Sequence, residues 1–392
     1  MAITNKIGAP VTGEDFFGRT NELAKAHRYL NEGQSLLLSA PRRIGKSSLA
    51  KKIIADKLSD NWKCVYIDLQ GIATKENFLR KLINSFTGVG LMEKTVSRVK
   101  NFLNTTFYAT ENVELGPIKI DLKNREFFEE IYNNLSDIFD HSKDTLIVID
   151  ELPLFLGKLT DEDGNNRDEV EFLLNWFRSI RQYDNSHIRW IFCGSVGLRN
   201  FTNHHRMSKA INDLIDFHLG ELNKEEAKGL MMALSKSYNL ILSDKIADQT
   251  LEILQWPIPY FIQLLIDRLI TNLSNSETNE VTIDDALQAI KELSHSDYFM
   301  TWDERLDEYR ELEDLARKTL ESFAVVEQGL SKEKLLQVAM KGIPGSEEIK
   351  IKKELTKVLE MLEHDGYIIR SSEIRKFRSP LLREWWKYKF ID

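Results

Sequence analysis

Cysteine is scarce in this chain, and long apolar runs are missing from it. The 2 cysteines, Cys64 and Cys193, both lie inside apolar segments of strand-like composition. Such placement favours small core side chains and argues against a disulfide or a structural zinc site. No apolar stretch approaches the roughly 20 residues that cross a bilayer, and no charged-then-apolar leader begins the sequence. We therefore expect no membrane span and a cytosolic location.

An excess of positive charge is also lacking. Lys and Arg total 53 against 61 Asp and Glu, which gives a formal net charge of −8. This balance argues against a protein coated in basic charge for nucleic acid, although local basic patches are compatible with an acidic total. With 42% hydrophobic and 29% charged residues the composition is that of a globular protein, and 392 residues predict two or three domains.

The segment 36–49 has the order that a nucleoside-triphosphate site requires. An apolar run enters a tight loop, and the loop opens a helix at Gly45-Lys46-Ser47. Backbone N–H groups and a helix N-terminus then converge on phosphates. Lys46 would reach the β- and γ-phosphates, and the Ser47 hydroxyl would ligate Mg²⁺. The predicted nucleotide-binding loop comprises Ala40, Pro41, Arg42, Arg43, Ile44, Gly45, Lys46, Ser47 and Ser48.

One position departs from the G-x-x-x-x-G-K-[ST] pattern of such loops. Ala40 stands where the pattern has its first glycine. An alanine serves there only if its φ is negative, because a Cβ disfavours the left-handed region. The alternative is a chance Gly-Lys-Ser on a surface helix. The buried strand before the loop and the amphipathic helix after it favour the phosphate loop.

The second motif is acidic and lies at the end of a predicted buried strand, residues 145–150. Its apolar residues end in Asp150 and Glu151. Asp150 at the carboxyl end of such a strand can hold the Mg²⁺ shell, and Glu151 can polarise the attacking water. The alternative is that Asp150 only caps the following loop. Together with Lys46, the acidic pair favours a nucleoside-triphosphatase.

Strands and helices alternate through the first half of the chain. Apolar runs at 35–39 and 64–69 are each followed by a helical pattern, at 47–58 and about 75–86. This β-α-β-α order predicts a parallel sheet with helices on both faces. A later strand at 188–193 ends at Gly194-Ser195, so Ser195 is either a γ-phosphate sensor or a turn serine.

Two further segments modify this domain. Alternating residues around Gly116-Pro117 predict a hairpin insertion near 110–122, before a helix at 125–140. Ahead of the first strand, Phe16-Phe17-Gly18-Arg19 either closes over a nucleotide base or anchors the segment by packing.

The second half of the chain reads as helical. Residues 221–296 predict a helical lid, with helices at 224–237, 244–254, 259–273 and 283–293. The segment Trp256-Pro257-Ile258-Pro259 forbids helix continuation and restarts the helix with Pro259 near its first turn. Such a fixed corner would set the lid against the adenine.

A charged connector at 297–312 leads to a predicted winged-helix domain at 313–392. Helices at 315–323, 331–340 and 349–364 precede two short strands at 366–370 and 376–378. The third helix would enter a DNA major groove or present a solvated or protein-binding face, because glutamates share its outer surface with lysines. The basic residues favouring an anionic partner are Lys350, Lys352, Lys353, Lys357, Arg370, Arg375, Lys376, Arg378 and Arg383. Trp385 and Trp386 are interpreted as packing residues.

Taken together, these motifs resemble the archaeal-type ATPase family of the AAA+/STAND-class P-loop ATPases. Phe17-Gly18-Arg19 resembles its N-terminal box, residues 40–47 its Walker A motif and residues 146–151 its Walker B motif. Gly194-Ser195 is similar to its sensor-1 turn, and residues 377–383 to the end of its winged helix. The resemblance implies an α/β P-loop core at 1–220, followed by the lid and the winged-helix domain.

The chain departs from the family in two places. Pro257 stands where the lid element of the family, Gly-x-Pro, has glycine, with Pro259 as its proline. No clear arginine finger is found, although Arg199 and Arg206 lie in the corresponding region. The resemblance therefore implies turnover that is slow or that requires a second subunit or partner.

Three hypotheses for function follow from the sequence. The leading one is an intracellular ATPase that uses ATP and Mg²⁺ as a conformational switch and acts on a homo-oligomer or a protein partner. The second is a nucleotide-gated DNA-binding regulator that contacts DNA through residues 349–383. The third is an ATP-dependent oligomerising module of a stress or defence system. None of the three requires a membrane.

Overall fold

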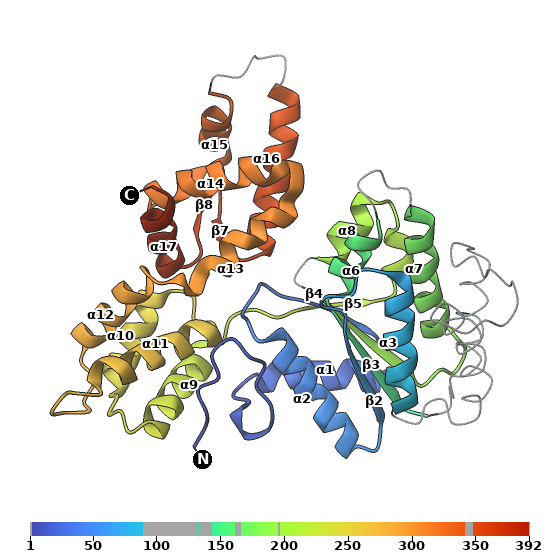
Figure 1. Cartoon of the computed structure of the whole chain (residues 1–392), viewed down its shortest axis with the longest axis horizontal. Coiled ribbons are helices and arrows are strands. Elements are labelled where there is room, and N and C mark those ends of the chain that lie inside the picture. Colours follow the sequence, from blue (N-terminus) through green and yellow to red (C-terminus); the bar gives the residue numbers. More distant parts are fainter. Residues whose placement is uncertain are drawn as a thin grey trace, which may run out of the picture. The chain divides into compact units, whose positions relative to one another are not determined.

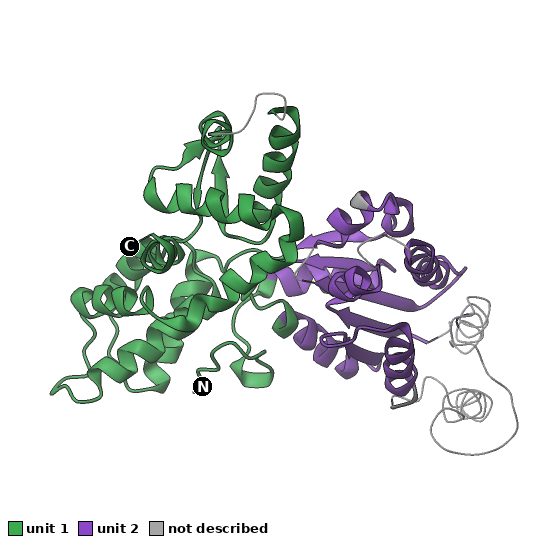
Figure 2. Ribbon diagram, turned by 45° about the horizontal axis from the view of Figure 1, so that its top comes forward, with its two compact units in different colours: residues 1–20, 40–48, 219–392 green, residues 21–39, 49–218 purple. Residues whose placement is uncertain are grey.

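A computed structural model describes residues 2–88, 132, 143–160, 166–194, 197–341 and 348–391. The chain divides into two compact units (Figure 2). Residues 21–39 and 49–218 form one, here called the sheet unit, and residues 1–20, 40–48 and 219–392 form the other, the helical unit. The predicted hairpin at 110–122 and Ser195 lie outside the described residues, as does the predicted helix at 125–140 apart from Tyr132.

The sheet unit contains a parallel sheet with the strand order β2-β3-β4-β1-β5, which confirms the predicted α/β class (Figure 1). β1 lies between β4 and β5, so its carboxyl end opens from the interior of the sheet. Every residue of β3 is buried. The strands are β1 (Leu36–Ser39), β2 (Lys63–Asp68), β3 (Thr145–Asp150), β4 (Ile188–Gly194) and β5 (Ile215–His218).

The register aligns the carboxyl ends of these strands. Ser39 pairs with both Gly194 and His218, and Asp68 pairs with Asp150. Because the strands are parallel, these ends share one edge of the sheet, the edge at which open α/β sheets bind ligands. The chain therefore leaves β1, β3 and β4 from the same edge.

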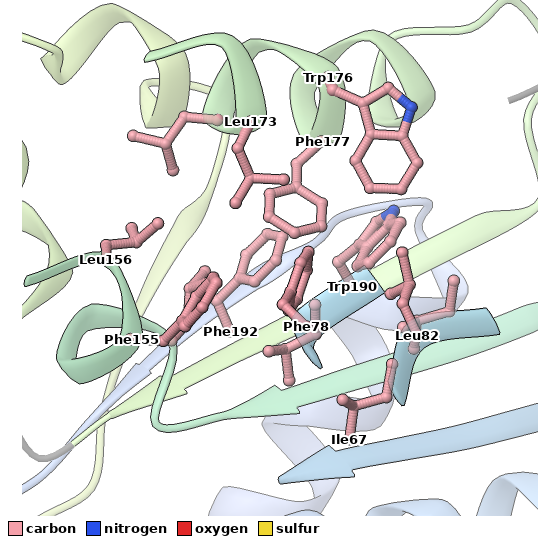
Figure 3. Close-up of a cluster of buried hydrophobic side chains, with 14 of the residues drawn as sticks. Ile67, Phe78, Leu82, Phe155, Leu156, Leu173, Trp176, Phe177, Trp190 and Phe192 are labelled. Atoms are coloured by element: carbon pink, nitrogen blue, oxygen red, sulfur yellow. The ribbon is translucent and has the colours of Figure 1, made fainter. Parts of the chain in front are cut away.

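A large hydrophobic core covers one face of the sheet. Phe78 of α3 stacks on Phe155 of α6 with ring centroids 4.8 Å apart, and Trp190 stacks on Phe192 at 5.5 Å. Figure 3 shows these rings meeting Phe177 of α7. Each such side chain contributes roughly 1.5–3 kcal/mol by leaving water. The helices of this unit are α1 (Thr20–Asn31), α2 (Lys46–Ser59), α3 (Lys75–Gly88), α6 (Leu152–Leu159), α7 (Arg167–Arg181), α8 (Leu198–His204) and η3 (Ser208–Ile211).

The opposite face of the sheet is buried as well. Leu37, Ile147 and Ile149 belong to this core. Successive strand residues point to opposite faces, so the residues next to them in sequence face away from it. These residues are also buried: Leu36, Leu38, Leu146 and Val148. Cys64 and Cys193 are free and buried within β2 and β4, as the sequence predicts. Among the described residues, no helix is both long and apolar enough to cross a membrane.

The first half of the helical unit matches the predicted lid helices residue for residue. α11 packs on both α9 and α12, and α10 packs on α9. Asn223, Ser243 and Thr282 cap three of these helices by accepting a hydrogen bond from a first-turn N–H. The four helices are α9 (Lys224–Ser237), α10 (Asp244–Leu254), α11 (Pro259–Leu273) and α12 (Ile283–Leu293).

The predicted connector is itself helical. It comprises η4 (Asp297–Phe299), α13 (Met300–Asp303) and η5 (Glu304–Leu312), in which Arg310 has a φ of 53°. Trp302 of α13 lies against Trp256 at 5.7 Å and Tyr367 at 5.3 Å between ring centroids. The connector is therefore packed between the lid corner and the C-terminal elements of the same unit.

The last part of the helical unit combines helices with a small antiparallel sheet of order β6-β8-β7. α14 packs on α15, α16 and α17, and Trp385 and Trp386 of α17 are buried, as expected of packing residues. β6 and α17 are additions to the predicted elements. The elements are η1 (Gly13–Asp15) near the N-terminus and α14 (Glu313–Val325), β6 (Leu330–Ser331), α15 (Lys332–Ala339), α16 (Glu348–His364), β7 (Ile368–Ser371), β8 (Ile374–Phe377) and α17 (Pro380–Phe390).

Candidate functional site

The predicted phosphate loop joins β1 to α2. Positive φ angles in the loop occur at Arg43 (66°) and Gly45 (101°), and Ala40 is not among the residues with positive φ. The condition for an alanine at this position is therefore met. Ala40 and Ile44 are buried, and Lys46 is 8% exposed at the start of α2.

The N-terminal segment braces this loop within the helical unit. The backbone N–H of Val11 donates to Ser48 Oγ at 3.0 Å, and Arg43 Nη1 donates to the Gly8 carbonyl at 3.1 Å. The Arg43 guanidinium also stacks on the ring of Tyr260, 4.7 Å from its centroid. Arg43 is thus tied to the N-terminal segment and the lid.

In the segment Phe17-Gly18-Arg19, Arg19 contacts the same loop, whereas Phe17 contacts α9. Arg19 is 3% exposed and donates to the carbonyls of Ile44 at 3.0 Å and Glu221 at 3.1 Å. An added Cβ on Gly229 of α9 would lie 2.9 Å from Phe17 Cζ, so Phe17 packs on the lid. Two roles were predicted for the aromatic pair, packing and contact with a nucleotide base. The contact with Gly229 is of the packing kind, and contact with a base stays a prediction.

Pro259 and Pro41 show where the loop meets other elements of its unit. A Cβ on Gly45 would lie 4.0 Å from Pro259 Cγ at the first turn of α11. A Cβ on Gly366, whose φ is +84°, would lie 2.9 Å from Pro41 Cβ. The first of these contacts places the predicted lid proline beside the phosphate loop.

Arg42 links the loop to the connector. Its guanidinium donates to the Thr301 carbonyl at 3.2 Å and to the Glu308 carboxylate at 3.1 Å. Glu308 also pairs with Arg305, which donates to Asp365 at 2.8 Å. A continuous set of ion pairs therefore runs from the phosphate loop to the end of α16.

The Arg305–Asp365 pair is buried, with side chains 3% and 5% exposed. Burial by itself would raise the pKa of the Asp365 carboxyl, but the Arg305 guanidinium outweighs burial and holds that pKa below its ordinary value. A second set of contacts also reaches the C-terminal elements. The Arg378 guanidinium donates to the Glu221 carboxylate at 2.6 Å and stacks on Trp256, 5.1 Å from its ring centroid.

The acidic motif lies at the end of β3 in the sheet unit. Asp150 is 3% exposed, and both of its carboxylate oxygens accept hydrogen bonds. Tyr66 Oη donates to Oδ2 at 2.7 Å, and the Glu151 N–H donates to Oδ1 at 3.1 Å. Glu151 has a left-handed backbone, with φ 59°, ahead of α6. A non-glycine residue in this region is uncommon and is concentrated at functional sites.

The remaining predicted residues are less informative. β4 ends at Gly194, directly before Ser195, which lies outside the described residues. Arg199 is engaged within the sheet unit, where it pairs with Asp216 at 2.5 Å and donates to the Leu214 carbonyl at 3.2 Å. Arg206 has a φ of 59°. The identity of an arginine finger stays a prediction.

Sequence reasoning missed Tyr66, Glu308, Arg305 and Asp365. The contacts that give them a role span long stretches of chain: 84 residues separate Tyr66 from Asp150, 266 separate Arg42 from Glu308, and 60 separate Arg305 from Asp365. The only local signal was the polar end of the β2 run, which places Tyr66 two residues before Asp68.

Comparison with protein families gives one match. A model described as an ATPase domain predominantly from Archaea matches residues 16–256. The matched range contains the N-terminal box, the phosphate loop, the acidic motif and the first lid helices. No curated protein sequence matches the chain.

Two solved structures share the fold. The Walker-type ATPase paby2304 of Pyrococcus abyssi is 19% identical, with a TM-score of 0.61 over 98% of this chain and 99% of that one. The ORC2 protein of Aeropyrum pernix, solved in ADPNP-ADP complexes, is 12% identical, with a TM-score of 0.57 over 97% of this chain and 94% of that one. At these identities the likeness concerns the fold alone.

Proposed function

Because this chain belongs to the family of ATPase domains found predominantly in Archaea, we propose that ATP binding and hydrolysis switch the conformation of its connector and C-terminal elements. Family membership establishes the ATPase activity. The proposal adds the use to which that activity is put. One observation carries the proposal. The guanidinium of Arg42, a residue of the phosphate loop, donates two hydrogen bonds to the connector, one to Thr301 and one to Glu308.

The proposed site assigns the phosphates to Lys46 and the amides of the loop 40–48. Ser47 and Asp150 would hold Mg²⁺, Glu151 would orient the attacking water, and Ser195 would contact the γ-phosphate. Phe17, Gly18, Arg19 and Pro259 would line the nucleotide through the N-terminal segment and the lid.

The residues present fit a magnesium ion. Mg²⁺ prefers hard oxygen ligands, and Asp150 supplies a buried carboxylate whose two oxygens are both oriented by hydrogen bonds. When bound, the ion would neutralise charge that develops on the phosphates. The chain's own part is to keep the Asp150 carboxylate oriented and to keep Glu151 in its left-handed backbone conformation.

The switch follows from a competition for Arg42. In the structure its guanidinium is neutralised by Glu308. Nucleotide phosphates are stronger, multivalent acceptors for a guanidinium than one carboxylate. A triphosphate on the loop would draw Arg42 from the connector and free Glu308, whose other partner is Arg305. The C-terminal elements would then loosen from the loop.

The test is to weaken the connector side alone. Glu308→Gln removes the charge that holds Arg42, so less of the ATP-binding free energy is needed to release the connector. We expect the Kd for ATP, measured by calorimetry with Mg²⁺, to fall by about 5-fold or more. Glu304→Gln is the matched control, because Glu304 is exposed four residues earlier. Equal ATP affinity in wild type and Glu308→Gln would contradict the switch.

A second candidate function is DNA binding through residues 349–383. Lys352, Lys353 and Lys357 are exposed on α16, which supports it. Arg375 and Arg378 support it less than the sequence suggested, because they pair with Glu363 and Glu221 at 2.6 Å each. Duplex binding that weakens steeply with salt, and that is lost when the three lysines become alanine, would establish this function. Oligomers formed with ATP but without duplex affinity would instead favour the interaction module.

A further inference from the structure

We propose that Tyr66 is a positioning residue for the metal ligand Asp150. The inference rests on the proposed assignment of Asp150 to Mg²⁺, and it adds a residue that neither motif contains. It is carried by one geometric fact within the sheet unit, the hydrogen bond of 2.7 Å from Tyr66 Oη to Asp150 Oδ2.

Strand register explains why Tyr66 reaches this carboxylate. β2 and β3 are parallel neighbours, in which Tyr66 pairs with Val148 and Asp68 with Asp150. A tyrosine two residues before the strand end is long enough to extend its hydroxyl to the end of the neighbouring strand. A shorter side chain at position 66 would leave Oδ2 without this donor.

The hydroxyl and the backbone together fix both oxygens of Asp150. Oδ2 accepts from Tyr66 and Oδ1 accepts from the Glu151 N–H at 3.1 Å. An ionised carboxylate can only accept hydrogen bonds, so a donor on each oxygen fixes the orientation of the group. Outer partners of this kind orient metal ligands, and their loss typically weakens metal affinity about 10- to 100-fold.

The Tyr66 ring is held in turn by α2. The Lys51 ammonium lies 5.5 Å from the ring centroid, a cation–π distance. Lys51 is four residues after Ser47, the other proposed metal ligand, so the two lie one turn apart on the same side of α2. The helix that carries Ser47 thus also supports the residue that orients Asp150.

If the Tyr66 hydroxyl occupied the lone pair that the metal needs, it would compete with the cation and its removal would tighten metal binding. The direction of change in Tyr66→Phe therefore decides between positioning and competition.

The experiment compares nucleotide binding with and without metal. A fluorescent, non-hydrolysable ATP analogue is titrated into wild type and Tyr66→Phe, in excess Mg²⁺ and in EDTA. We expect the Kd in EDTA to agree within about twofold, because the phosphate loop is intact. The tightening of that Kd by Mg²⁺ should fall by about 10-fold in the variant. The free Mg²⁺ at half-maximal ATPase rate should rise by a similar factor.

A matched control removes the same chemical group elsewhere. Tyr309 also donates its hydroxyl to a buried aspartate, Asp365, at 3.1 Å. Tyr309→Phe should lose stability without changing the ratio of the two Kd values. If the ratio of the Kd in EDTA to the Kd in Mg²⁺ fell in both variants, general loosening would explain the effect and the proposal would be overturned. An unchanged or larger ratio in Tyr66→Phe would overturn it as well.

Failure of the underlying assignment gives a different result. If Asp150 is not a metal ligand, Asp150→Asn keeps the wild-type ratio of the two Kd values. If Asp150→Asn loses the metal effect while Tyr66→Phe keeps it, only the role of Tyr66 is overturned.

Discussion

At the scale of single residues, two positions next to each other carry different parts of the proposed chemistry. Asp150 is buried and hydrogen-bonded through both oxygens, whereas Glu151 begins the next segment with a left-handed backbone. The proposal assigns the metal to the buried carboxylate of Asp150 and the attacking water to Glu151.

Lys46 and Glu151 should separate binding from hydrolysis. Lys46→Ala removes the cation that neutralises the β- and γ-phosphates and should abolish measurable ATP binding. Glu151→Gln keeps size and polarity but cannot accept a proton, so ATP binding should persist while kcat falls by about 100-fold or more. Calorimetry and single-turnover hydrolysis measure the two effects. Tight ATP binding by Lys46→Ala, equal to that of wild type, would contradict the site.

The sequence was sufficient for residues whose role follows from local order. The loop 40–48 and the pair Asp150-Glu151 combine a strand, a turn and a polar residue within one short segment. Tyr66 and Asp365 were beyond reach, because their roles depend on register and on packing between segments distant in sequence. A tyrosine inside an apolar run carries no sign of a hydroxyl aimed at a neighbouring strand.

At the scale of elements, helices and strands were predictable when they were long and when their apolar residues recurred at a regular spacing. The lid helices α9 to α12 were predicted with the bounds that the structure has, because an apolar stripe at helical spacing repeats over several turns. β5 has only 4 residues, too few for its alternating pattern to stand out, so it was missed. The helices of the connector were missed because charged residues dominate the segment and its kink at Arg310 interrupts the period.

The junction of η5 and α16 gives a pH-dependent prediction. The Asp365 carboxyl has a lowered pKa in the folded protein, so its stabilisation is present above the unfolded pKa of about 4 and is lost as pH falls towards the folded value. At pH 7, Asp365→Asn should lower the free energy of unfolding by about 3 kcal/mol, because it removes the buried carboxylate that pairs with the Arg305 guanidinium.

Urea unfolding at several pH values checks this expectation. The gap between the unfolding free energies of wild type and Asp365→Asn should stay near its pH 7 value down to about pH 5 and narrow as the pH falls below about 4. Asp184→Asn is the control, because Asp184 is exposed and its variant should follow wild type at each pH. A gap that stays constant with pH would mean that Asp365 is not stabilised as the charged form.

At the scale of the whole molecule, the central feature is the set of segments with which the phosphate loop makes contact. By its internal contacts the loop 40–48 groups with the N-terminal segment, the lid and the C-terminal elements in one compact unit. The bonds of Arg42, Arg43 and Ile44 within that unit give a physical reason for this grouping. In the proposed switch, a ligand on the loop would act on residues that also contact the connector.

Hydrogen exchange on Glu151→Gln tests this account most directly. The variant retains ATP, so exchange of residues 297–312 and of α16 can be followed by mass spectrometry with and without bound ATP and Mg²⁺. The account predicts faster exchange in the connector when ATP is bound, and no such change in Lys46→Ala. Unchanged exchange in Glu151→Gln, with ATP binding verified by calorimetry, would contradict the proposed switch.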